Sequence, residues 1–243
     1  MKLPSGVITY KAPCFGTGYA KNIGIKYAKG KYIAFTDDDC IVHRDWLLDI
    51  VSSFEENSKA SAIFGKILPY RTKNNRGRYC PATAVSRTKR FFDHPTYHGE
   101  IGSGNNMAYR TSIFKKVGGF KNWLGPGSIG MNADDAEMVM RLFHNNLGIL
   151  YNPTILVYHN RWLDKKNYDK QIFNYALGEV ACYTYYAFKA NDLAKSIIMG
   201  HIYSIRDEFR SSIKNFRMLF KTCKELIGIL YAFTVGAFFA LIS

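Results

Sequence analysis

The amino-acid sequence predicts one α/β domain with a helical C-terminal part. Three observations support this fold class. The segment Tyr32–Asp39, YIAFTDDD, is an apolar run that ends in three carboxylates, as a buried strand ends in a ligand-binding loop. Helix-like and strand-like patterns alternate between residues 16 and 159. A content of 47% hydrophobic and 15% aromatic residues in 243 is enough for a packed core.

Three adjacent carboxylates, Asp37 to Asp39, follow the apolar residues of this strand. Like charges at such short spacing repel one another, so we expect a bound cation to offset them. Mg²⁺ or Mn²⁺ suits the segment, because both ions prefer oxygen ligands and need only one or two carboxylates when a diphosphate supplies the rest. A solvated acidic turn is the alternative. A calcium loop of the EF-hand type fits poorly, because Val42 stands where that loop needs glycine and Leu48 where it needs glutamate.

The chain carries a net charge of +14 and has an isoelectric point of about 9.5. These values predict an anionic partner: a phosphorylated ligand, a membrane surface or a nucleic acid. The sequence contains no recognisable nucleic-acid module, so we expect no nucleic-acid partner. Its five cysteines are scattered and form no CxxC pair, which favours a reducing compartment over a disulfide framework or a zinc site.

A glycine-rich turn, Gly16-Thr17-Gly18, precedes the first expected helix. This helix is expected to open at Ala20-Lys21-Asn22 and to end at Gly30. A helix start with a lysine and an asparagine can hold a diphosphate through backbone N–H groups, the helix dipole and the lysine charge. The residues expected on the packed face of the helix are Ile23, Tyr27 and Ala28.

Four further segments are assigned before residue 93. Asp45–Phe54 predicts a helix, Ser61–Ile67 a strand and Thr83–Phe92 another helix. Pro69–Cys80 is polar and basic, so we expect a solvated loop, although its charges could meet phosphates. The residues expected to bury the first of these helices are Trp46, Leu47, Ile50, Val51 and Phe54.

The loop Asp93–Gly102 contains a candidate metal pair, His94 and His98. Because no acidic ligands accompany them, we interpret both as ordinary loop histidines. A short strand over Gly104–Arg110 and a helical turn over Ser112–Val117 are expected next.

The segment Lys121–Asn132 is rich in glycine and proline and can order over a bound ligand. Asp134 and Asp135 then open a helix over Ala133–Asn145. Acidic residues are common in a first helical turn because the helix dipole favours them, so a structural role remains an alternative for both.

Two strands, Gly148–Tyr151 and Thr154–Tyr158, are expected next, with a kink at the proline between them. His159 follows the second strand at its carboxyl end. The acidic loop is expected at the mouth of the same sheet, so we interpret His159 as a candidate metal ligand.

The C-terminal part has a different pattern. A helix rich in tyrosine and phenylalanine is expected over Lys165–Lys189, and it is followed by an apolar stripe bordered by cations. This pattern is typical of a helix in a membrane interface, with packing on the α/β domain as the alternative. The apolar stripe comprises Ile198, Ile202, Ile205, Phe209, Ile213, Phe216 and Phe220, and the basic stripe Arg206, Arg210, Lys214, Arg217 and Lys221.

Leu226–Ile242 carries no charge and has about the minimum length for a membrane span, roughly 17 residues. We favour a membrane-embedded helix whose N-terminal end stays cytoplasmic because of Lys221 and Lys224. The expected domains are therefore an α/β domain at 1–164, an amphipathic helical tail at 165–224 and a transmembrane or membrane-embedded helix at 225–243.

Taken in order, these segments resemble the family 2 glycosyltransferases, which have the GT-A fold, a Rossmann-like three-layer α/β/α domain. GTGYAKNIGIKYAKGKYIAFTDDD resembles the family's first helix and its DXD strand. GSGNNMAYRTSIFKKVGGF resembles its Gly-x-Asn segment, and LGPGSIGMNADDAEMVMRL its lid and Glu-Asp catalytic motif. ILYNPTILVYHNRW resembles a strand that ends in histidine, and YALGEVACYTYYAFKAND the tail helix of membrane-associated members. The resemblance covers about residues 16–192.

The resemblance implies a role for each matching residue. Asp39 would bind a divalent metal, Mg²⁺ or Mn²⁺, with Asp37 and His159 as further candidate ligands. Asp37 and Asp38 would contact the donor's ribose and diphosphate, and Asp135 would be the catalytic base of an inverting transfer. Lys21 and Asn22 would lie near the diphosphate, and the sugar and acceptor site would be shaped by Asn105, Asn106, Trp123, Asp134, Arg161 and Trp162.

Three departures from the family pattern stand out. Lys21 replaces the usual arginine, and Asp134 replaces the glutamate of the Glu-Asp motif. The family also begins with a nucleotide-binding βαβ unit, whereas this chain starts just before the glycine-rich turn. We therefore expect an N-terminally truncated fold with an exposed strand edge.

The resemblance implies a glycosyltransferase of the hexosyltransferase type at the cytoplasmic face of the cell membrane. Its donor would be a nucleotide-diphosphate sugar, with UDP the commonest nucleotide and GDP or dTDP open. Its acceptor would be lipid-linked or a polysaccharide, as in cell-envelope polysaccharide biosynthesis. A catalytically inactive membrane-bound remnant or fragment of such an enzyme is the main alternative. A basic phosphate- or nucleic-acid-binding protein is a third hypothesis, but it leaves the acidic motifs without a role.

Overall fold

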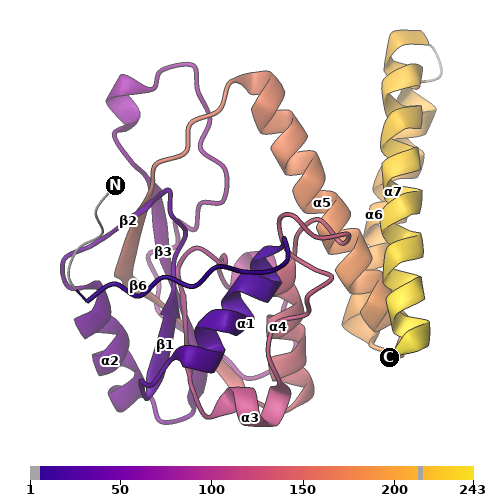
Figure 1. Cartoon of the computed structure of the whole chain (residues 1–243). Helices are drawn as coiled ribbons and strands as arrows, with labels where there is room; N and C mark the ends of the chain where they lie inside the picture. Colours follow the sequence, from indigo (N-terminus) through magenta and orange to yellow (C-terminus); the bar gives the residue numbers. More distant parts are fainter. Residues whose placement is uncertain (1–5, 213–215) are drawn as a thin grey trace.

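The computed structural model describes residues 6–212 and 216–243 and contains a mixed six-stranded sheet (Figure 1). The strand order is β1-β5-β3-β6-β2, and β4 also pairs with β6. The strands are β1 (Tyr32–Phe35), β2 (Cys40–Val42), β3 (Ala60–Pro69), β4 (Arg90–Phe92), β5 (Met107–Arg110) and β6 (Gly148–His159).

The two long strands β3 and β6 form the centre of the sheet and run parallel, from Ala60 beside Gly148 to Pro69 beside His159. β5 is antiparallel to both β3 and β1, so β1 points in the same direction as the central pair. The carboxyl ends of β1, β3 and β6 therefore meet at one edge of the sheet. Open α/β sheets bind ligands at this edge.

Helices cover both faces of the sheet, which confirms the predicted three-layer α/β/α architecture. α1 (Thr17–Tyr27), α3 (Ile113–Val117) and α4 (Asp134–His144) pack on one face, and α2 (Trp46–Glu56) packs on the other. Alternate residues of β3 serve the two layers: Phe64 faces the first cluster and Ile63 the second.

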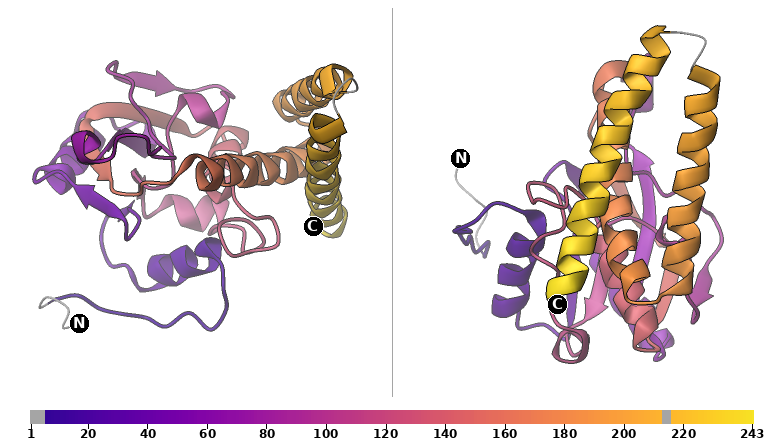
Figure 2. Two further views of the ribbon diagram at one scale, coloured as in Figure 1. Left: turned by 90° about the horizontal axis from the view of Figure 1, so that it is seen from above. Right: turned by 90° about the vertical axis from the view of Figure 1, so that its right-hand side faces the viewer.

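Three C-terminal helices stand beside this domain (Figure 2). They are α5 (Lys165–Phe188), α6 (Asp192–Ser212) and α7 (Phe216–Ile242). α5 joins them to the domain, because its buried face, including Leu177 and Ala181, packs in one cluster with Ala136 and Met140 of α4. Within the described residues, α7 contains one stretch long and apolar enough to cross a membrane, Glu225–Ile242, with a mean hydropathy of 2.0.

Several local expectations were wrong. Thr83–Phe92 is extended instead of helical, because Ala84 pairs with Ile67 and β4 pairs with β6, which satisfies backbone groups that a helix would bond internally. The two strands expected around Pro153 form one strand, β6, with a register shift opposite Gly65 and Lys66.

The faces of two helices also differ from expectation. α1 begins at Thr17 and packs on the core through Ile25, whereas Tyr27 is exposed and stacks on Tyr10. On α2, Leu47 and Val51 are exposed, while Trp46, Ile50 and Phe54 are buried as expected. In the C-terminal stripe, Ile198 is buried and Ile202 exposed. The remaining stripe positions, 205 to 221, lie outside the side chains that the structure describes, and Ile213 and Lys214 outside the described residues altogether.

The side chain of Asn106 holds the irregular part of the sheet together. Its Nδ2 donates to the carbonyl oxygens of Lys66 (2.9 Å) and Ile155 (2.8 Å), and its Oδ1 accepts from the Trp46 indole N–H (2.9 Å). Gly65 leaves room for this amide, because a Cβ there would lie 2.2 Å from the Ile155 oxygen. β3, β6 and α2 thus depend on one buried amide.

We predict that Asn106→Ala lowers the free energy of unfolding by about 2–4 kcal/mol, because three buried polar groups lose their partner. Urea unfolding in detergent measures this difference. The matched control is Asn105→Ala, since the neighbouring amide is equally buried but has no hydrogen-bond partner among the described residues. Equal destabilisation by the two substitutions would contradict the role of Asn106.

Candidate active site

A cavity of about 750 Å³, lined by many charged and polar residues, opens at the carboxyl edge of the sheet. Loops after β1 and β6, the start of α1, the start of α4 and one face of α5 line it. The sequence-predicted residues that the structure brings together here are Lys21, Asp37, Asp38, Asp39, Asn105, Asp134, Asp135, His159 and Arg161.

The backbone places the acidic turn against the end of β6. After β1 the chain reverses, and β2 pairs antiparallel with β6 so that Cys40 lies opposite His159. The N–H of Asn160 also donates to the carbonyl oxygen of Asp39 (2.8 Å). As a result, Asp39 Oδ1 lies 3.3 Å from His159 Nε2, and Asp39 Oδ2 lies 3.7 Å from an Arg161 guanidinium nitrogen.

The buried ring of His159 fits the role of a metal ligand. Its Nδ1 lies 2.7 Å from the Pro81 carbonyl oxygen, which only accepts hydrogen bonds, so we assign the ring proton to Nδ1. The Nε2 lone pair then faces the Asp39 carboxylate. Two electron-rich groups at this distance repel each other, and a cation bound between them would remove that repulsion. An oxygen ligand and an imidazole suit Mn²⁺, and Mg²⁺ with a diphosphate.

Cys40 is the third residue whose ligand atom lies within 4.8 Å of these two. Burial, with the charge of Asp37, raises the pKa of its thiol to about 11, so it stays neutral near pH 7. Asp37 does not belong to this group within the described part of the chain. Its pKa is raised by burial and by Asp39, whereas Lys21 lowers it. Among the charged neighbours of Asp37, Lys21 thus has the largest effect on its pKa.

Lys21 supplies a buried positive charge in the wall of the cavity. Its Nζ lies 2.5 Å from Asp134 Oδ2, and both side chains are largely buried. Burial alone would lower the pKa of Lys21, but Asp134, Asp135 and Asp37 together raise it, so the ammonium stays charged. Lys21 thus offsets three of the carboxylates that meet here.

Asp135 lies in the first turn of α4, where N–H groups converge on its carboxylate. Its Oδ2 accepts from the Gly104 N–H (2.7 Å) and its Oδ1 from the Ala136 N–H (2.9 Å). The Nε2 atom of His98 lies 3.4 Å from Oδ2. Burial would raise the pKa of Asp135, but His98, Lys21 and these hydrogen bonds hold it well below its usual range.

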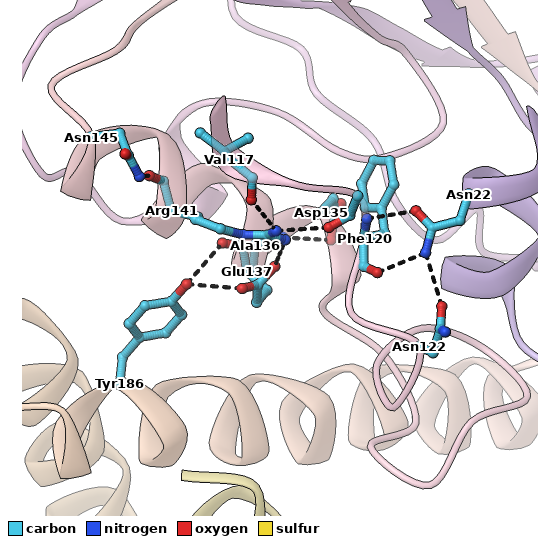
Figure 3. A network of polar contacts seen from close by, with 11 residues as sticks. Asn22, Val117, Phe120, Asn122, Asp135, Ala136, Glu137, Arg141, Asn145 and Tyr186 are labelled. Atoms are coloured by element: carbon cyan, nitrogen blue, oxygen red, sulfur yellow. Dashed lines mark hydrogen bonds and ion pairs between the residues drawn. The ribbon is translucent and has the colours of Figure 1, made fainter. Parts of the chain in front are cut away.

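Polar contacts behind Asp135 fix α4 in place (Figure 3). Arg141 pairs with the fully buried Glu137 and donates to the carbonyl oxygens of Val117 and Gly119, both at 2.7 Å. Glu137 also accepts from the Tyr186 hydroxyl of α5 (2.9 Å). The helix that carries Asp134 and Asp135 is therefore tied to α5 and to the turn after α3.

Four sequence-predicted site residues have structural contacts instead and do not line the cavity. Asn22 bonds both backbone groups of Phe120, at 2.7 and 2.8 Å, and Asn106 bridges the sheet as described above. Trp123 stacks on Phe239, with ring centroids 4.5 Å apart, and Trp162 donates to the Tyr70 carbonyl oxygen (2.9 Å).

The sequence reasoning missed two groups of cavity residues. His98 lines the cavity although we interpreted it as an ordinary loop histidine. α5 contributes Tyr168, Gln171, Tyr175 and Glu179, whose positions carried no sequence signal of their own.

Three side chains in the cavity wall have buried polar atoms without a hydrogen-bond partner among the described residues. They are Thr17, His98 and Asn105. Buried polar atoms in native proteins are nearly always paired, so a polar ligand is expected to complete them.

The chain matches the family model described as Glycosyl transferase family 2 over residues 2–118. The glucosyl-dolichyl phosphate glucuronosyltransferase of Haloferax volcanii is 23% identical over 163 residues, which are 65% of this chain and 52% of that protein. The chain thus spans about half the length of this curated relative.

Two solved structures share the fold, each with a TM-score of 0.51 and 17% sequence identity. One is S. aureus TarS 1–349, matched over 91% of this chain and 60% of that one. The other is the mannosyltransferase PcManGT from Pyrobaculum calidifontis in complex with GDP-Man and Mn²⁺, matched over 93% and 60%. These structures show the GT-A fold. The family model, which covers just under half of the chain, and the curated glycosyltransferase relative support the assignment of the chain to the family 2 glycosyltransferases.

Proposed function

We propose that the chain transfers a sugar from a nucleotide-diphosphate sugar to an acceptor hydroxyl, with inversion at the anomeric carbon. The observation that carries this proposal is the single cavity shared by the acidic turn after β1 and by Asp135 at the start of α4. The acidic turn suits a charged donor, and Asp135 offers a fixed carboxylate in the same cavity. These are the two parts that a displacement reaction needs.

The reaction is a one-step displacement. The acceptor oxygen forms a bond to the anomeric carbon while the bond to the diphosphate oxygen breaks, and that electron pair leaves with the nucleoside diphosphate. Asp135 takes the hydroxyl proton, a contribution of about 10²–10⁴-fold for a typical general base. Its hydrogen bonds to Gly104 and Ala136 aim the carboxylate before the acceptor arrives.

The cavity residues divide between donor and acceptor in this proposal. Asp39 and His159 would hold Mg²⁺ or Mn²⁺, which supplies positive charge for the departing diphosphate when bound. Asp37 and Asp38 would contact the donor's ribose and diphosphate, with Lys21 near its charge. Asn105, Asp134 and Arg161 would shape the sugar and acceptor side. UDP is the donor nucleotide we favour, and the GDP-Man bound to PcManGT keeps GDP as the alternative.

We also propose a lipid-linked acceptor at the cytoplasmic face of the membrane. The Haloferax relative is described as acting on a glucosyl-dolichyl phosphate, which is a lipid-linked sugar. Lys221 and Lys224 before the apolar stretch favour the cytoplasmic side.

The two faces of α7 suggest how the chain meets the bilayer. One face packs on α5 so closely that a Cβ at Gly236 would lie 2.2 Å from the Ala181 carbonyl oxygen. The opposite face is an exposed apolar stripe of Ile227, Leu230, Phe238 and Leu241. We infer that α7 lies along the membrane surface with this stripe in the lipid, because crossing the bilayer would require it to leave α5.

The base assignment predicts that Asp135→Asn lowers transfer by at least about 10²-fold while nucleotide affinity changes less than about twofold. Asparagine keeps the shape and can still accept from Gly104, but it cannot take a proton. Transfer of radiolabelled sugar and calorimetric titration with nucleotide measure the two effects. Asp93→Asn, on an exposed loop, is the matched control. A loss of nucleotide binding as large as the loss of transfer would contradict the assignment of Asp135 as the base.

The membrane proposal predicts that Leu230→Gln with Phe238→Gln lowers partitioning into phosphatidylglycerol vesicles by at least about tenfold. Each apolar side chain loses part of the roughly 1.5–3 kcal/mol gained by its burial. The control is Leu47→Gln with Leu48→Gln, which are as exposed on α2. Vesicle flotation measures binding. An equal loss in both pairs contradicts the proposal, and retention of the bound protein after alkaline extraction would favour the spanning helix that the sequence predicts.

A further inference from the structure

His98 is the nearest titratable neighbour of the proposed base. It opens a short 3₁₀ turn, His98–Glu100, that follows β4 along the chain. Its side chain is 13% exposed, and its Nε2 lies 3.4 Å from Asp135 Oδ2. Apart from this long contact, neither ring nitrogen has a hydrogen-bond partner among the described residues. The Asp135 carboxylate is thus the polar group that the imidazole can bond.

Other ionisable groups surround His98 from three elements. Asp134 and Asp135 face it from α4, Glu179 and Tyr183 from α5, and Tyr97 precedes it in the loop. Glu179 is already engaged, because both of its carboxylate oxygens accept from the Tyr97 hydroxyl at 3.0 Å and one lies 3.9 Å from His201. Asp135 is therefore the carboxylate available to His98.

The environment of Asp135 creates a chemical difficulty for the base that the proposed function requires. The charge of a protonated His98 stabilises its anion most, followed by Lys21, and two N–H donors add to this. A carboxylate stabilised this strongly binds a proton weakly, whereas an efficient general base has a proton affinity matched to the working pH. A neutral His98 removes the larger of the two charges and with it much of this difficulty.

We propose that His98 is the positioning residue of the proposed base: the neutral imidazole donates its Nε2–H toward Asp135 Oδ2 and orients the carboxylate for the acceptor. This inference rests on the proposed function. The acceptor hydroxyl gives its proton to Asp135, which releases that proton to solvent after the transfer. An imidazolium at the same place is a full positive charge against the carboxylate, and it lowers the proton affinity of the base.

The proposal fixes the direction of the pH dependence. Burial would lower the pKa of His98, but Asp135 raises it above the ordinary 6.5. Only the neutral ring leaves Asp135 its full proton affinity, so transfer is complete above the pKa of His98 and is lost as the pH falls through it. The acidic limb of kcat/KM therefore belongs to His98 and lies above pH 6.5.

The test compares His98→Gln with His94→Gln, a histidine on the same loop that is exposed and paired with Asp93. Glutamine can still donate to Asp135 but does not titrate. We expect His98→Gln to lower kcat/KM at pH 8 by roughly tenfold or more and to abolish the acidic limb. His94→Gln is expected to keep the wild-type profile. A His98→Gln enzyme that is slower at every pH but keeps the limb would overturn the proposal, because that is the effect of a purely structural residue.

A second measurement decides the matter if His98→Gln is inactive or poorly folded. NMR titration of the ring protons gives the pKa of His98 directly, in the wild-type chain and in Asp135→Asn. We expect a value above 6.5 that falls when the carboxylate is neutralised. An unchanged value would overturn the pairing. An active Asp135→Asn enzyme would instead refute the proposed function, so the two failures are distinguishable.

Discussion

Electrostatic repulsion among carboxylates is the constraint on which this site depends. Asp37, Asp39, Asp134 and Asp135 all face one cavity. Two unit charges 4 Å apart repel by about 4 kcal/mol at the effective dielectric of a protein surface, and several such pairs would be prohibitive without cations. Lys21 stands against Asp134, and Arg161 against Asp39. Two cations against these four carboxylates leave net negative charge in the cavity, and the metal ion that we propose between Asp39 and His159 would reduce it.

Nearby polar side chains that hydrogen-bond within the protein hold the elements that carry these charges in place. Asn106 closes the irregular part of the sheet, Asn22 clamps the turn at Phe120, and Arg141 ties α4 to the rest of the domain. Adjacent residues therefore have opposite roles. Asn106 is fully bonded within the protein, whereas Asn105 next to it offers an unpaired amide to the cavity. Rigid support of this kind is what preorganises a charged site.

Hydrophobic periodicity predicted the elements whose core faces are simple. β1, β3, α2, α4 and α5 lie where the sequence placed them, because apolar spacing and helix or strand boundaries agree there. The helix predicted over Thr83–Phe92 was wrong because the conformation of this segment depends on pairing with β6 and β3. The local spacing of apolar residues does not reveal that pairing. Asp39 and His159 were expected at the same edge of the sheet, because both follow the carboxyl ends of strands that run in one direction. The structure brings the two side chains together there.

The roles of individual polar residues were harder to predict. Asn22 and Trp123 lie in family-like motifs but contact distant backbone or rings, and only the folded chain shows these partners. The role of His98 was not predicted because its acidic partner, Asp135, is 37 positions away in the sequence. The two residues meet only because α4 packs behind the loop. Sequence spacing could indicate the chemistry of each group but not the pairing between them.

The most direct test of the central claim is nucleotide binding by this 243-residue chain with and without Mn²⁺. Calorimetric titrations with UDP, GDP and dTDP in detergent would be run on the wild type, on Asp39→Ala and on the exposed control Asp192→Ala. The account predicts that one nucleotide binds only when Mn²⁺ is present, and that Asp39→Ala weakens this binding by at least about tenfold whereas the control does not. A folded chain that binds none of the three, or binds equally well without metal and without Asp39, would contradict it.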